Sequence, residues 1–164
     1  MKEDLEKLLS CRLNKNYLIE LINTNPIHFN DAVKLSLSRI EPQNWRAGWI
    51  LNHCLKRDDE RIRTKVNIYI KCLYGKKDGH QRELLKILNK CTPNRSNEGK
   101  LFNICVDIWE DIGKSPSVRI TAFKTMIKIT KKYPELNDEL KLLSEDHYLE
   151  SLSPGIKRSF KKLL

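Results

Sequence analysis

The sequence is poor in the residues that interrupt regular structure. Its 164 residues include only six glycines and six prolines, and aromatic side chains make up 7%. No stretch alternates between apolar and polar residues at a period of two, and no apolar run approaches the roughly 20 residues that a membrane-spanning helix needs. These absences argue against a β-sheet protein and an integral membrane protein. They favour an all-α chain whose helices are joined by short turns.

Paired cysteines and clustered metal ligands are also missing. The cysteines are odd in number and none forms a CxxC pair; they are Cys11, Cys54, Cys72, Cys91 and Cys105. A disulfide framework or a zinc site would show closer, paired spacing, and the four histidines form no HExxH or HxxxH arrangement. We therefore expect reduced thiols, no metal and no cofactor. Cys54, Cys72 and Cys105 lie among apolar neighbours and should be buried as small hydrophobic side chains.

Sequence motifs for catalysis are absent as well. The chain has no Gly-rich phosphate loop, no nucleophile elbow and no paired-carboxylate motif. Its first residues, MKEDLEKLLSCRLN, are charged throughout and lack the apolar stretch of a secretory signal. We expect a cytoplasmic, non-enzymatic monomer that does not associate with membranes.

Helical periodicity is present from end to end. Leu101, Cys105, Ile108 and Ile112, for example, recur at the three- and four-residue spacing that places them on one face of a helix. Turn signals such as Pro and Gly divide the pattern into ten segments. The predicted helices cover residues 2–12, 16–24, 29–39, 43–57, 59–74, 79–91, 97–112, 116–132, 135–151 and 154–164, the ninth being a candidate for a break.

Several of these helices begin with a recognisable start signal. Ser115-Pro116 and Ser153-Pro154 each combine a hydroxyl side chain for the N-cap with proline for the first helical position. Asp78, followed three residues later by Gln81, resembles a capping box. These signals support helix starts near residues 79, 116 and 154.

A basic position near the start of a helix recurs along the chain. It is occupied by Arg46, Arg82, Arg119 and Lys157, and the successive intervals are 36, 37 and 38 residues. Recurrence at roughly 35 to 45 residues is typical of helical pairs stacked in series, a solenoid. We predict five antiparallel pairs in one domain over residues 1–164, with 1–27 as a divergent N-terminal cap pair and 28–164 as four repeats.

The segment Ser115-Pro116-Ser117-Val118-Arg119-Ile120-Thr121-Ala122 resembles the second-helix start of the HEAT/armadillo-like family, in which Val-Arg is followed by small and apolar residues. The resemblance covers about residues 29–164. It implies a right-handed α-α superhelix whose second helices line a concave face. The aspartate that the family often places six residues before the arginine is replaced here by Ile40, Lys76 and Gly113. A tetratricopeptide array, at its 34-residue period, is the main competitor, but its signature residues are not recoverable.

Positive charge is concentrated on the predicted second helices. Residues 42–57, 78–91, 115–132 and 153–164 together hold a larger cation excess than the whole chain, whose net charge is +10. By the resemblance, these cations would form a basic concave face that attracts an anionic partner. We expect a scaffold or binding module for an acidic protein or peptide. Nucleic-acid binding through the phosphate backbone is the alternative, and a relative of the HEAT-like DNA alkylation repair glycosylases is a third.

Individual residues divide into two predicted roles. The recurrent residues are predicted to be structural; they are Arg46, Arg82, Arg119 and Lys157. For the three arginines we expect bridges between neighbouring repeats, because the rigid guanidinium fork suits several backbone acceptors. The candidates for partner contact are Lys86, Lys124, Lys128, Lys161 and Trp45. Trp49 and Trp109 are predicted to be core residues, and His80 is predicted to lie in an exposed first turn. Glu83 is the one carboxylate available to a glycosylase-like mechanism, because Asp78 is assigned to capping.

Overall fold

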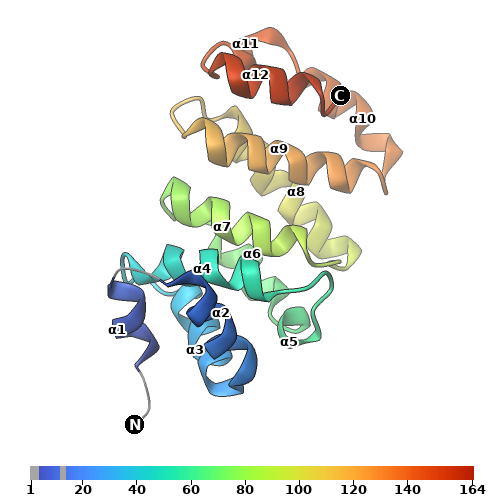
Figure 1. The fold of residues 1–164 in the computed structure, drawn as a ribbon. Coiled ribbons are helices and arrows are strands. Elements are labelled where there is room, and N and C mark those ends of the chain that lie inside the picture. The colour runs from blue at the N-terminus through green and yellow to red at the C-terminus, as the bar shows by residue number, and fades with distance from the viewer. Residues whose placement is uncertain (1–3, 12–13) are drawn as a thin grey trace. The chain divides into compact units, whose positions relative to one another are not determined.

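The structure is a computed structural model that describes residues 4–11 and 14–164. Within these residues it contains twelve α-helices and one 3-10 helix and no strand, which confirms the all-α prediction (Figure 1). The chain divides into two compact units, Met1–Thr92 and Pro93–Leu164. The single domain over residues 1–164 and the right-handed superhelix stay predictions.

The first unit is built around three helices that pack in sequence. α3 packs against α4 and α4 packs against α7, while α1 and α2 both lie on α3 and α4. The core is formed by side chains with at most 2% exposure, such as Ile50, Leu51, Tyr69 and Leu84. The helices are α1 (Leu5–Ser10), α2 (Lys15–Thr24), α3 (Pro26–Leu37), α4 (Gln43–Cys54), α5 (Glu60–Arg63), α6 (Val66–Cys72) and α7 (Asp78–Asn89).

The second unit is organised by one long helical pair. α8 packs along α9, and α10 and α12 pack on α9. Three aromatic side chains join these elements: the ring centroid of Trp109 lies 4.7 Å from that of Phe123 and 5.4 Å from that of Phe160. Trp109 is fully buried, which confirms it as a core residue. The elements are α8 (Arg95–Glu110), α9 (Pro116–Thr130), η1 (Pro134–Leu136), α10 (Asn137–Leu142), α11 (Asp146–Leu149) and α12 (Pro154–Lys161).

The predicted start signals have mixed outcomes. α9 and α12 begin with a proline at the first helical position, as predicted, and the Ser153 hydroxyl accepts a hydrogen bond from the Ile156 N–H. The capping box at Asp78 is wrong, because Lys77 occupies the N-cap and Asp78 is already helical. The Gln81 side chain instead donates to the Leu73 carbonyl at 2.8 Å, which ties the start of α7 to the end of the preceding helix.

The predicted helix over 59–74 is wrong in one respect, because it is divided into α5 and α6. The Lys65 N–H donates to the Ile62 carbonyl three residues back, at 2.8 Å. A three-residue bond tightens the helix to a 3-10 turn and changes its direction. The prediction missed this break because the apolar spacing continues across it.

The boundaries differ at two other places. The segment predicted as 135–151 is divided into η1, α10 and α11, and extended backbone at Glu145 separates the last two. The third predicted helix begins at Pro26 instead of residue 29, because the Asn25 side chain caps it by accepting from the Ile27 N–H at 2.9 Å. Residues 2, 3 and 12 of the first predicted helix lie outside the described residues.

His80 is not exposed, so that prediction is wrong. Its side chain is 3% exposed, and its Nε2 lies 2.6 Å from the Ser36 carbonyl oxygen. The first turn of α7 therefore packs against the end of α3, where the Ser36 hydroxyl also lies 2.9 Å from the Tyr69 hydroxyl. Burial lowers the pKa of His80, which favours the neutral imidazole.

The cysteines are all free, and their burial follows the prediction in part. Cys54 and Cys105 are buried, as expected, and burial raises the pKa of the Cys54 thiol to about 11. Cys72 is only half-buried, because its thiol faces the end of α3, where it donates to the Leu37 carbonyl at 3.3 Å.

Candidate binding surfaces

Arg119 is a fully buried cation that joins three segments of the second unit. Its Nε donates to the Trp109 carbonyl at 2.9 Å, and its two terminal nitrogens donate to the Ser151 hydroxyl and the Tyr148 carbonyl, each at 2.7 Å. The guanidinium also lies 4.8 Å from the centroid of the Trp109 ring. Burial lowers the pKa of Arg119, and Asp111 opposes that effect. The side chain is thus held by α8 on one side and by the segment before α12 on the other.

The other recurrent basic residues have different surroundings. Arg46 donates from one terminal nitrogen to the Leu9 carbonyl at 2.8 Å and to the Cys11 carbonyl at 3.3 Å, at the end of α1. Arg82 donates its Nε to the neighbouring Glu83 at 3.0 Å. Lys157 is half-buried, and its side chain makes no hydrogen bond to a described residue. That all four residues serve the stacking of repeats stays a prediction.

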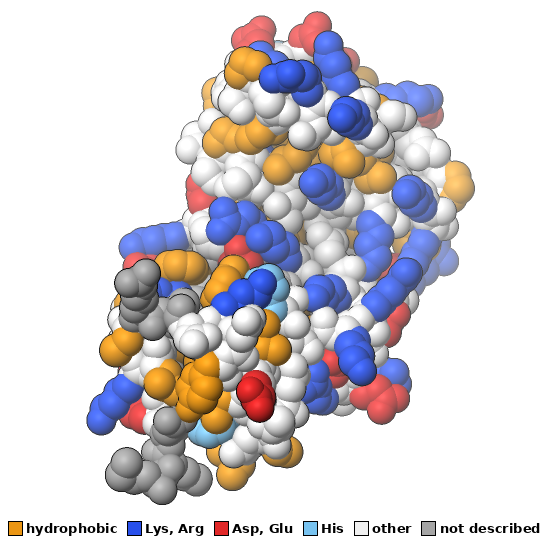
Figure 2. Space-filling view, viewed as in Figure 1, with side chains coloured by type: hydrophobic (Ala, Val, Ile, Leu, Met, Phe, Trp, Pro, Cys, Tyr) orange, Lys and Arg blue, Asp and Glu red, His pale blue; other side chains and the backbone are white. Residues whose placement is uncertain are grey.

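In the second unit, α9 and α12 carry the predicted lysine candidates. Lys124 and Lys128 of α9 and Lys131, the C-cap of that helix, are spaced by four and three residues, which places them on one side of it. Lys157 and Lys161 are four residues apart on α12, which packs on α9. We call these five residues the lysine face, and Figure 2 shows lysine and arginine side chains over these helices. Neither helix contains Asp or Glu.

Aliphatic side chains accompany the lysine face, whereas exposed rings do not. Ile120 and Ile127 on α9 and Ile156 on α12 are half-buried. The aromatic residues of the two helices, Phe123 and Phe160, are buried in the core. The surface of these helices therefore combines cations with partly exposed isoleucines.

In the first unit, a buried carboxylate holds two cations at the surface. The Glu83 side chain on α7 is 1% exposed, and its Oε1 accepts from Arg82 Nε at 3.0 Å and from Lys86 Nζ at 3.1 Å. Its Oε2 accepts from the Asn52 side-chain amide of α4 at 3.1 Å. Both oxygens of Glu83 are thus occupied by internal donors, and Lys86 keeps 45% of its side chain exposed.

Close contact between two helices explains why Glu83 is buried. A Cβ added to Gly48 of α4 would lie 3.1 Å from the Glu83 Cβ. Glycine at this point therefore lets α4 and α7 approach closely, and the carboxylate lies in their contact. No sequence motif indicates this cluster; the one available signal is the glycine inside a predicted helix.

Three rings lie along the exposed side of α4, and we call them the ring stripe. Trp45, Trp49 and His53 are spaced by four residues, so they lie on one side of the helix. Trp45 is 37% exposed, His53 is exposed, and the rings of Trp49 and His53 meet edge to face with centroids 5.1 Å apart. Trp49 is half-buried, so its prediction as a core residue is wrong: it lies at the edge of the core, on the side that carries His53.

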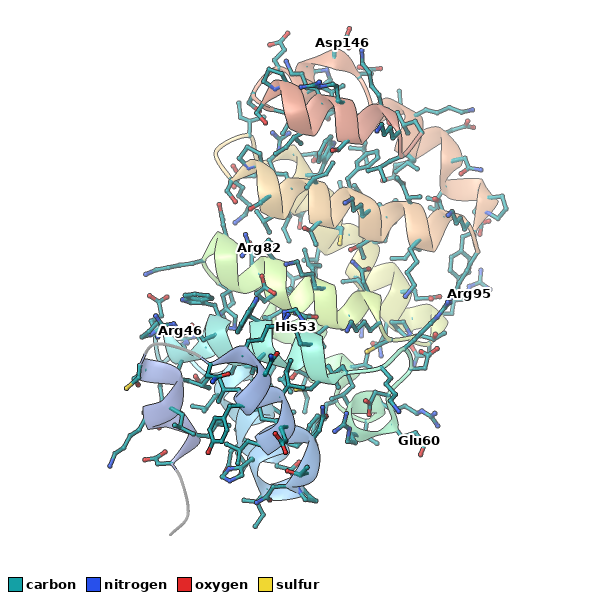
Figure 3. All side chains as sticks on the ribbon, viewed as in Figure 1. Arg46, His53, Glu60, Arg82, Arg95 and Asp146 are labelled. Carbon is teal, nitrogen blue, oxygen red and sulfur yellow. The ribbon has the colours of Figure 1, made fainter. Side chains whose placement is uncertain are left out.

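Cations border the ring stripe on two neighbouring helices. Partial desolvation of the imidazole lowers the pKa of His53, and Lys15 of α2 and Lys90 lower it further, while Glu83 opposes them. Lys90 also donates to the carbonyls of Asn52 and Leu55 at the end of α4. In Figure 3, Arg46 and His53 are labelled on α4 and Arg82 on α7. The field at the ring stripe is therefore positive.

The predicted partner-contact residues thus fall into two groups. Lys124, Lys128 and Lys161 belong to the lysine face of the second unit, whereas Lys86 and Trp45 lie on α7 and α4 of the first unit. Sequence reasoning missed the isoleucines beside the lysines. It also missed the ring contact of His53 with Trp49 and the ion pairs of Glu83 with Arg82 and Lys86. That any of these residues contacts a partner stays a prediction.

Two further properties concern the described residues. Among residues 4–11 and 14–164, no group of three or more His, Cys, Asp or Glu side chains is arranged to hold a metal ion. Within the same part of the chain, every helix is too short or too polar to cross a bilayer.

Comparison with known proteins supports the predicted HEAT-like helical repeat. A family model described as a HEAT repeat domain matches residues 1–164. No curated protein and no solved structure matches the chain. HEAT repeats generally mediate protein–protein interaction or scaffolding, and the family is typically non-enzymatic. The chain belongs to the HEAT repeat domain family.

Proposed function

We propose that this protein is a non-catalytic binding module whose lysine face engages an acidic, amphipathic segment of a partner protein. The observation that carries the proposal is the composition of α9 and α12. These helices carry two exposed lysines (Lys124 and Lys161), two half-buried lysines (Lys128 and Lys157) and three half-buried isoleucines, but no carboxylate and no exposed ring. An acidic segment with apolar residues at helical spacing would match both the charge and the aliphatic surface.

The same surface is a poorer match for nucleic acid. Phosphate contacts need only cations, but proteins that bind single strands add aromatic side chains on which the bases stack. Phe123 and Phe160 are buried beneath the lysine face and are not available for stacking. Binding of a duplex through phosphates alone remains the alternative that the experiment must distinguish.

The glycosylase alternative has less support from the surroundings of Glu83. A general base needs an oxygen that can accept a proton from the reacting group. Both oxygens of Glu83 already accept from Arg82, Lys86 and Asn52, at 3.0 to 3.1 Å. This carboxylate is placed as the counter-ion of two cations.

A binding experiment with defined probes tests the proposal. The probes are a fluorescent amphipathic peptide of Glu and Leu at helical spacing, the same peptide with Lys in place of Glu, and a duplex DNA. We expect the acidic peptide to bind at 50 mM salt and the basic one not to bind. The double variant Lys124→Glu/Lys128→Glu should weaken binding by about tenfold or more, because it replaces two attractions with two repulsions.

The matched control is Lys100→Glu, which reverses an exposed lysine on α8 of the same unit. It should change the affinity by less than about twofold, because α8 is not part of the lysine face and salt screens exposed charges. Circular dichroism should show unchanged helix content in both variants. The proposal fails if the acidic peptide does not bind, or if it binds the double variant as tightly as the wild type. Tighter binding of the duplex, lost in the same double variant and steeply dependent on salt, would instead establish the nucleic-acid alternative.

A further inference from the structure

The ring stripe of the first unit has a different chemistry from the lysine face. The aliphatic residues of α4, among them Ala47, Ile50 and Leu51, are all buried, and so are those of α7. What α4 and α7 leave at the surface is aromatic, amide or charged. An amphipathic protein helix would find no aliphatic surface here, so this surface suits a ligand that combines flat rings with negative charge.

We propose that the ring stripe, together with the cations of α7, is a binding site for single-stranded nucleic acid. Stacking of bases on aromatic side chains beside a positively charged track is how proteins bind single strands without reading their sequence. Trp45 and Trp49 are separated by one turn of α4, a rise of about 6 Å, so they offer two successive ring surfaces. Arg82 and Lys86 supply the charge.

The site is preorganised by contacts inside the unit. Glu83 holds Arg82 and Lys86 at 3.0 and 3.1 Å, so these two side chains are fixed beside α4 in the absence of a ligand. Arg46 is anchored at the end of α1, and its guanidinium lies 5.5 Å from the centroid of the Trp45 ring. A base would therefore stack on the other side of that ring. Side chains ordered in advance reduce the entropy that binding costs.

The imidazole of His53 completes the ring stripe as a neutral ring at pH 7. Its pKa is lowered by partial desolvation and then by Lys15 and Lys90. It lies against Trp49, with ring centroids 5.1 Å apart. Phosphates rather than the imidazole would be attracted by the surrounding lysines, which leaves the ring for contact with a base.

The test is a titration with a twelve-nucleotide oligo(dT), followed by the fluorescence anisotropy of a label on the DNA and by quenching of tryptophan emission. We expect oligo(dT) to bind at 50 mM salt and to quench the tryptophan emission. A duplex of the same length should bind at least about tenfold more weakly, because paired bases cannot stack on the protein. Trp45→Ala removes a ring that is 37% exposed and should weaken binding about tenfold without loss of helix content. Trp49→Phe keeps a smaller ring and should have an intermediate effect.

The matched controls are a ring and a lysine elsewhere in the same unit. Tyr74 is 65% exposed and lies next to Lys76 and Lys77, so Tyr74→Ala tests whether any exposed ring near cations is sufficient. Lys71→Gln on α6 is the control for Lys86→Gln on α7, since both variants remove one positive charge from the same unit. We expect wild-type affinity from the Tyr74 and Lys71 variants and weaker binding from the Lys86 variant.

Several results would overturn this inference. The first is that the Trp45 variant binds oligo(dT) as tightly as the wild type, and the second is that single strand and duplex bind equally well. The third is that an acidic peptide displaces oligo(dT) at a similar concentration. The last result would identify an acidic protein as the occupant. Lys124→Glu/Lys128→Glu should leave oligo(dT) binding unchanged, so this inference and the proposed function of the lysine face can fail independently.

Discussion

Replacement of Arg119 by alanine should destabilise the second unit by about 3 kcal/mol. The substitution removes three hydrogen bonds from a charged donor, each of which contributes roughly 1.5–3 kcal/mol. It also leaves the Trp109 and Tyr148 carbonyls without this donor and opens a cavity beside the Trp109 ring. The desolvation of a buried guanidinium is relieved at the same time, and that cost of several kcal/mol offsets much of the gross loss.

A second variant separates the hydrogen bonds from the packing. Arg119→Met keeps most of the side-chain volume and removes the charge, so it should cost about 1–2 kcal/mol, less than alanine. Ser151→Ala removes one acceptor only and should cost about 1 kcal/mol. Urea unfolding, followed by circular dichroism at 222 nm, gives the free energies of unfolding for comparison with the wild type.

The control is Lys157→Ala, which changes the recurrent basic position of the next predicted repeat. Because the Lys157 side chain makes no hydrogen bond to a described residue, its loss should cost less than about 0.5 kcal/mol. The reasoning is refuted if Arg119→Met is as stable as the wild type, since the hydrogen bonds would then contribute nothing net. It is also refuted if Lys157→Ala costs as much as Arg119→Ala.

Three further predictions concern packing, pH and thiol reactivity. Gly48→Ala should destabilise the first unit by about 1–3 kcal/mol in urea unfolding, because its Cβ would lie 3.1 Å from that of Glu83. The control is Gly99→Ala, whose Cβ would meet nothing within 4 Å; it should be neutral or stabilising by up to about 1 kcal/mol. Because burial lowers the pKa of His80, the unfolded chain binds more protons than the folded protein below about pH 6.5. The free energy of unfolding should therefore fall as the pH is lowered from 7 to 5, and it should fall less in His80→Gln. An equal fall in the variant and the wild type would contradict the role given to His80. A thiol reagent at pH 8 should label exposed Cys11 rapidly but Cys54, whose pKa is about 11, only when the protein unfolds; equal rates would show that Cys54 is accessible.

The fold was largely predictable because the sequence carries two patterns: apolar spacing within each helix and recurrence between helical pairs. Apolar spacing such as that from Leu101 to Ile108 identifies a helix. The separate recurrence of a basic position every 36 to 38 residues indicates helical pairs that need one another to bury their apolar sides. The break between α5 and α6 was not predictable in the same way, because a single three-residue hydrogen bond at Lys65 redirects the helix without changing the apolar pattern. The burial of His80 depended on Ser36, which lies 44 residues away in the sequence.

The residues of the candidate surfaces show what a repeat motif leaves undetermined. Arg46, Arg82 and Arg119 occupy the same recurrent position, yet one reaches backbone carbonyls of α1, one pairs with the residue beside it, and one is buried among three acceptors. The interval sets where each basic residue stands on its helix, but its partner depends on the side chains and chain ends of the neighbouring element. Arg119 is enclosed because Tyr148 and Ser151, at the end of α11 and just after it, lie against its guanidinium, whereas Arg82 is half-buried and its Nε pairs with Glu83 beside it in the sequence. A recurrent arginine therefore predicts a position in the stack, and its division between structural and binding roles has to be tested residue by residue.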